Sequence, residues 1–184
     1  MEITFARTGQ RTYTTVVVRD DGVTIAVPSF DRPAWLPHDL AHYVVEHALG
    51  LTQGFWGCVA AGAVFPGMTV VSGRQPPHAA ARSQAIMREM EQHGTEAEVL
   101  VGILVGIVQD GLDPRGPAAH ARVSDAWQDP RYVAREPLHA EKVYQVCIAL
   151  REAQQQWQAL AIGQSITVTW AHHRARKRST ARSM

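Results

Sequence analysis

The sequence predicts an α+β fold: a small antiparallel sheet, formed by N-terminal strands and one C-terminal strand, with several helices packed on one face. The chain starts with short runs of β-branched residues, continues through a long middle part with helical periodicity, and returns to a β-type run at residues 165–170. Because the last strand can pair with the first ones, the sheet would join both ends of the chain. This connection argues against separate N- and C-terminal domains.

Three strands are expected near the start of the chain. Residues 3–7 and 13–19 are rich in Val, Ile and Thr, which favour an extended backbone. Asp21-Gly22 is a typical two-residue hairpin turn and precedes a third such run, residues 23–27. Together these segments predict a three-stranded antiparallel start.

A first helix is expected to begin near Pro37, since proline suits the first turn of a helix, and to end at Gly50. Large apolar residues at helical spacing predict a second, buried helix over residues 55–65. Residues 68–72 fit either a short strand or a loop.

Three further helices are expected in the rest of the chain. They cover residues 78–93, residues 95–108, which open with a capping box, and residues 138–160. Residues 111–137 contain several prolines and no sustained period, so we expect a long irregular loop there, with one short turn at residues 124–127.

The composition predicts one globular domain over residues 1–173 and a basic flexible tail over residues 174–184. A chain of 184 residues with 46% hydrophobic residues can bury a proper core. Five of the eighteen Lys and Arg residues lie in the tail, so the rest of the chain has a net charge of about −4. The tail lacks aromatic residues for base stacking and basic tails are usually solvated, so we expect no nucleic-acid partner.

The sequence also indicates the cellular compartment in which the protein is expected. The N-terminus lacks the basic start and long apolar core of a signal peptide, and the most apolar run, residues 99–108, is too short to span a bilayer. Cys58 and Cys147 form no CxxC pair. We therefore expect a soluble protein in the cytoplasm that makes no membrane contact, and the sequence predicts no particular oligomeric state.

The first helix carries the side chains best suited to bind a metal ion or to take part in catalysis. On a helical wheel His38, His42, Glu46 and Asp39 fall within about 100° of one another, and apolar residues cover the opposite side. Two histidines four residues apart can both present a ring nitrogen to one ion, since their Cβ atoms are about 5–6 Å apart. The sequence therefore predicts His38 and His42 as metal ligands.

Residues 38–42, HDLAH, resemble the HExxH segment of zinc metallopeptidases. The resemblance implies that His38 and His42 bind Zn²⁺ and that a general base acting on metal-bound water stands at the position of Asp39. Aspartate is one methylene shorter than the glutamate of that segment. The resemblance covers five residues of 184.

A zinc site also needs a third protein ligand. On a straight helix His38 and Glu46 are two turns apart, roughly 12 Å along the axis, so Glu46 cannot easily join both histidines on one ion. The third ligand is therefore expected from another element. Six residues are alternatives: His78, Glu89, His93, Glu96, Glu98 and His139.

Two functional interpretations follow. In the first, the chain is a metal-binding, hydrolase-like protein that acts on a small molecule or peptide, with Zn²⁺ on His38 and His42. Asp39 or Glu46 then serves as the catalytic general base, or as an acidic residue that holds a metal-binding histidine in place. In the second, the polar face of the helix is only solvated, with Asp39 near the positive end of the helix dipole. The chain is then a non-catalytic binding or assembly protein.

Overall fold

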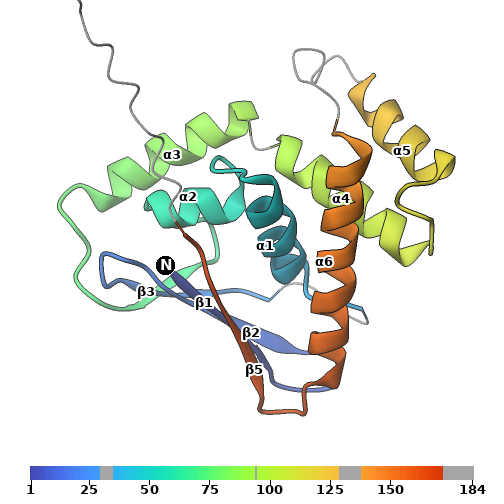
Figure 1. Cartoon of the computed structure of the whole chain (residues 1–184). Helices are drawn as coiled ribbons and strands as arrows, with labels where there is room; N and C mark the ends of the chain where they lie inside the picture. The colour runs from blue at the N-terminus through green and yellow to red at the C-terminus, as the bar shows by residue number, and fades with distance from the viewer. Residues whose placement is uncertain (30–34, 94, 129–137, 172–184) are drawn as a thin grey trace, which may run out of the picture.

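The computed structural model describes residues 1–29, 35–93, 95–128 and 138–171. Within these residues five strands form one antiparallel sheet and six helices accompany it, so the predicted α+β class is confirmed. Figure 1 shows the helices gathered on one face of the sheet. The basic tail predicted at residues 174–184 lies outside the described residues.

The sheet joins the two ends of the described chain, as predicted. Its strand order is β4-β3-β2-β1-β5. The strands are β1 (Glu2–Arg7), β2 (Tyr13–Val18), β3 (Thr24–Val27), β4 (Thr69–Ser72) and β5 (Ser165–Thr169). Strand β5 pairs antiparallel with β1, placing Ile166 opposite Phe5. The short run at residues 68–72, for which strand and loop were both open, forms the edge strand β4 beside β3.

Alternation along the strands decides which face of the sheet the helices cover. In β2 the side chains of Tyr13, Thr15 and Val17 are buried, whereas those between them are exposed. The turn between β2 and β3 lies at Asp21-Gly22, where Gly22 has a φ of 80° that a side chain would strain. The hairpin therefore forms where the sequence predicts it, but its loop spans residues 20–22 in place of the predicted two, because the N–H of Arg19 donates to the carbonyl of Val23. Its buried face turns toward the helices.

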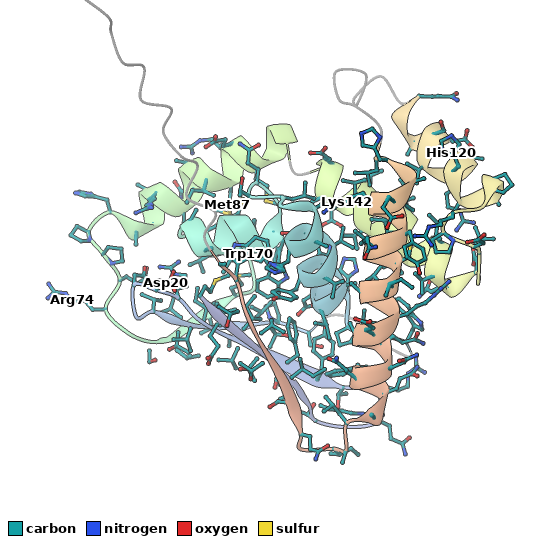
Figure 2. All side chains as sticks on the ribbon, viewed as in Figure 1. Asp20, Arg74, Met87, His120, Lys142 and Trp170 are labelled. Atoms are coloured by element: carbon teal, nitrogen blue, oxygen red, sulfur yellow. The ribbon has the colours of Figure 1, made fainter. Side chains whose placement is uncertain are left out.

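The first helix is central in the helical layer. The helices are α1 (His38–Leu49), α2 (Phe55–Ala61), α3 (Ala79–His93), α4 (Thr95–Gln109), α5 (Pro117–Trp127) and α6 (Ala140–Ala159). Helix α1 packs against both α4 and α6, and Val45, Leu104 and Leu150 of these three helices are fully buried. Figure 2 shows side chains filling the layer between the sheet and the helices.

The predicted irregular loop at residues 111–137 is wrong in its middle part, where α5 forms. Pro117 stands in the first turn of this helix, where its missing N–H costs nothing. Ala119 and Val123, one turn apart, are buried against the core. The prolines around this stretch mask its helical period. Residues 129–137 of the predicted loop lie outside the described residues.

Neither a membrane-crossing helix nor a disulfide occurs in the part of the chain that the structure describes. None of the helices there combines the length and hydropathy needed to span a bilayer. Cys58 and Cys147 are both buried free thiols, and burial raises the pKa of each to about 11. Both thiols are therefore protonated at neutral pH and act as small core residues.

Candidate metal centre

Three side chains with metal-binding atoms converge between α1 and α4. Nε2 of His42 lies 3.1 Å from Nε2 of His38 and 3.4 Å from Oε2 of Glu98. The remaining pair, His38 Nε2 and Glu98 Oε2, is 3.8 Å apart. Within the described residues this is the group of three whose ligand atoms all lie within 4.8 Å of one another, close enough to share one cation.

Each member of the group is positioned by ordinary helix geometry. His38 and His42 are one turn apart on α1, so their side chains lie on the same face. Glu98 belongs to the first turn of α4, which packs alongside α1. The structure thus places both predicted ligand residues next to one of the six alternatives for the third.

The polar face of α1 is not simply solvated. His42 is 3% exposed and Glu46 is 0% exposed, whereas the side chains of His38 and Glu98 are 60% and 55% exposed. An isolated solvated face of α1 would leave His38, His42 and Glu46 all in water. The interpretation of this face as wholly solvent-exposed is therefore wrong at His42 and Glu46, and the group has a buried inner side and an open outer side.

Glu46 lies behind His42, on the inner side of the group. Its Oε1 accepts a hydrogen bond from Nδ1 of His42 at 2.9 Å, and its two oxygens accept the backbone N–H groups of Phe55 and Trp56, each at 2.9 Å. These amides open α2, whose N-cap residue, Gly54, supplies no side-chain cap. The carboxylate therefore caps α2, keeps the proton of His42 on Nδ1 and turns Nε2 toward His38 and Glu98.

Gly54 makes room for this arrangement. A Cβ atom at this position would overlap the carboxylate of Glu46. The contact explains why a residue without a side chain stands immediately before Phe55. The sequence shows the glycine but not its neighbour, because the approach of α2 to Glu46 is a tertiary contact.

Asp39 is held toward the sheet. Its two carboxylate oxygens accept hydrogen bonds from the Tyr13 hydroxyl at 2.6 Å and the Thr15 hydroxyl at 2.9 Å, and Trp56 Nε1 donates to its backbone carbonyl at 2.9 Å. Sequence reasoning did not identify Tyr13 and Thr15 as part of this region. The signal that could have revealed them is a polar residue at a buried position of the alternating strand β2.

The charges in the group influence one another. Burial disfavours the charged form of His42, but its hydrogen bonds with Glu46 and Glu98 outweigh this effect and raise the pKa of His42 to about 9. Hydrogen bonds with His38 and His42 lower the pKa of the Glu98 carboxyl well below its ordinary value. The lone pairs of the two histidine Nε2 atoms and the carboxylate of Glu98 repel one another at such short separations unless a positive charge lies among them. A proton on His42 or a bound cation can supply that charge.

A pocket of about 160 Å³ opens beside the group. Its polar lining residues are His38, Asp39, His42 and Glu98. The remaining lining residues are apolar and come from the end of β3 and the residue after it, from α2 and from the connection between α2 and β4: Val27, Pro28, Phe55, Phe65, Pro66 and Met68.

The other histidines and acids that were considered do not join the group where the structure describes their side chains. His47, the remaining histidine of α1, stacks on Tyr43 with ring centroids 5.3 Å apart and also approaches Trp170. Four alternatives for a third ligand are not among the three clustered side chains: His78, Glu89, Glu96 and His139. The side chain of His93, the remaining alternative, lies outside the described part of the structure.

No family model, curated protein or solved structure matched the chain. Its function must therefore be inferred from the chemistry of this centre and of the pocket beside it.

Proposed function

We propose that this chain is a zinc-binding, hydrolase-like protein in which His38, His42 and Glu98 hold one ion. Distances between the donor atoms support the proposal. In a tetrahedral zinc site with ligands about 2.0–2.1 Å from the ion, neighbouring ligand atoms are roughly 3.3–3.4 Å apart. The three separations in this group are 3.1, 3.4 and 3.8 Å, so small side-chain adjustments suffice to place all three atoms around one ion.

The observation that carries the proposal is the buried contact behind His42. A histidine that binds a metal through one ring nitrogen usually donates its other N–H to a carboxylate or carbonyl, which fixes the ring and raises its basicity. Nδ1 of His42 makes this contact with Glu46, and both residues are almost fully buried. Two imidazoles and one carboxylate also form a donor set typical of zinc sites that retain an open position.

The open position is what suggests hydrolysis. Three protein ligands leave the fourth corner of a tetrahedron for water, and zinc lowers the pKa of bound water to about 7. The pocket borders all three proposed ligand residues. A substrate carbonyl in this pocket would meet the metal-bound water and be polarised by the same ion.

The two acidic residues of α1 receive different roles. Glu46 is occupied by His42 and the amides of α2, so we assign it the task of orienting His42. Asp39 lines the pocket and supplies a carboxylate there in addition to that of the proposed ligand Glu98. We assign Asp39 the role of accepting a proton from the water, with Tyr13 and Thr15 holding it in place.

The metal content of the purified chain tests the proposal. The protein is prepared without a histidine tag or chelator, and zinc is measured by elemental mass spectrometry in the wild type, His42→Ala and His47→Ala. His47→Ala is the matched control because it removes a histidine from the same helix but outside the group. We expect about one equivalent of zinc in the wild type and the control and none in His42→Ala. Absence of metal from the wild type after incubation with zinc, or its retention in His42→Ala, would overturn the proposal.

A further inference from the structure

The lining of the pocket beside the candidate centre is of two chemical kinds. The proposed ligand residues and Asp39 are polar, and the other lining residues are apolar side chains and prolines. Among the described lining residues there is no lysine and no arginine. This division indicates a ligand with a metal-binding group at one end and an uncharged group at the other.

We propose that the pocket selects substrates with an aromatic or branched aliphatic group directly beside the oxygen that binds the metal. The inference rests on the proposed zinc site and extends it to the class of substrate. The size of the pocket agrees with such a group: a cavity of roughly 150 Å³ lined by apolar side chains accommodates benzene, and this pocket measures about 160 Å³.

The aromatic wall begins immediately beside the proposed metal ligand. The rings of His42 and Phe55 have centroids 6.1 Å apart, and Phe55 stacks on Phe65 with centroids 5.2 Å apart and an interplanar angle of 18°. Met68 extends the wall, with its sulfur accepting the backbone N–H of Phe65. A ring that enters the pocket next to the ion meets aromatic faces and a thioether, which make favourable contacts with aromatic groups.

Charge argues against an anionic group packed on the apolar lining residues. A carboxylate or phosphate there would lose its hydration. None of the described apolar lining residues carries a positive charge that could compensate for the lost water. The apolar part of the lining therefore accepts a neutral group, and the polar residues with the proposed ion accept the oxygen of a carbonyl or a related chelating group.

Two hydroxamic acids with the same chelating group provide the test. Acetohydroxamic acid carries a methyl group and benzohydroxamic acid a phenyl ring, and both are titrated calorimetrically into the zinc-loaded full chain. The affinity of each compound for free zinc is measured separately and used to correct the comparison. We expect benzohydroxamic acid to bind at least tenfold more tightly than acetohydroxamic acid. Equal affinities, or a preference for the smaller compound, would overturn the inference.

Variants locate the preference in the pocket. Phe65→Ala removes part of the aromatic wall. It should lower the affinity for benzohydroxamic acid while leaving the affinity for acetohydroxamic acid unchanged. Val71→Ala is the matched control, because Val71 is an exposed apolar residue on β4 that does not line the pocket. If Phe65→Ala fails to fold, the comparison of the two compounds on the wild type still decides the question.

The two proposals fail in different ways. A chain that binds neither zinc nor either hydroxamic acid contradicts the zinc site, and the inference falls with it. A chain that binds zinc and both compounds with equal affinity keeps the zinc site and contradicts the substrate class alone.

Discussion

Oε1 of Glu46 lies 2.9 Å from Nδ1 of His42, and both side chains are almost completely removed from water. A buried carboxylate is costly unless donors surround it. Glu46 has the imidazole N–H and the two amides that open α2. The same contacts that stabilise the start of α2 therefore fix the ring of His42, coupling the fold to the candidate metal centre.

Glu46→Gln should weaken zinc binding although Glu46 is not a proposed ligand. The amide offers one oxygen and one NH₂ group, so a buried N–H loses its acceptor. We expect the zinc affinity to fall by about 10–100-fold and the free energy of unfolding by about 1–3 kcal/mol. Competition with a chromophoric zinc chelator and urea denaturation measure the two effects.

Glu141→Gln is the control for this variant. It removes an exposed ion pair in which Arg115 and Glu141 are 2.8 Å apart, a contact that solvent screens. Zinc affinity should be unchanged in it. If both variants bind zinc as the wild type does, Glu46 does not orient His42.

Gly54→Ala tests the space that the carboxylate needs. The added methyl group would overlap Glu46, so Glu46 must move away from His42 or α2 must shift. We expect a loss of about 1–3 kcal/mol in the free energy of unfolding together with weaker zinc binding. Gly102→Ala on α4 is the control, because a Cβ there meets nothing within 4 Å, and it should stabilise the helix by up to about 1 kcal/mol. Equal tolerance of the two substitutions would show that Gly54 is not needed for this contact.

The zinc-free protein should lose stability as the pH rises. Folding raises the pKa of His42 from its ordinary 6.5 to about 9. A raised pKa in the folded state stabilises the fold fully below pH 6.5, and the contribution disappears as the pH rises through about 9. Chemical denaturation of the zinc-free protein at several pH values between 6 and 9.5 should show this decline, and His42→Gln should flatten it.

Zinc binding should follow the opposite trend over the same window. The ion competes with the proton on Nε2 of His42, so its affinity should increase from pH 6.5 toward pH 9. Proton release measured by calorimetry in buffers of different ionisation enthalpy checks this expectation. An affinity that does not vary with pH would mean that the ion does not displace a proton from His42.

Asp39→Asn should separate metal binding from hydrolysis. Because Asp39 is not a proposed ligand, the zinc content should equal that of the wild type. We expect kcat/KM for a p-nitrophenyl ester to fall at least tenfold, since proton transfer by a positioned side chain contributes about 10²–10⁴-fold to such reactions. Asp125→Asn, an exposed substitution on α5, is the control. A full rate in Asp39→Asn would refute the assignment of the base.

The sequence could predict the features that depend on local geometry. The spacing of His38 and His42 places both on one face of any helix that contains them. The hairpin at Asp21-Gly22 and the pairing of the last described strand with the N-terminal sheet also followed from short-range patterns and from the order of the segments. These features needed no knowledge of how the helices pack.

The remainder depends on tertiary contacts. Glu98 was one of six alternatives, and only the packing of α4 against α1 brings it to the histidines. Glu46 shares their face in the sequence, but the approach of α2 turns its carboxylate away from the outer side. Helix α5 was missed because its apolar period is short and lies among prolines and glycine.

The most direct test of the zinc site is the anomalous diffraction signal of crystals grown from the zinc-loaded chain, recorded on both sides of the zinc absorption edge. The account predicts one strong peak among Nε2 of His38, Nε2 of His42 and a carboxylate oxygen of Glu98, about 2.0–2.2 Å from each. A peak elsewhere in the molecule, or no peak among these three side chains, would contradict it.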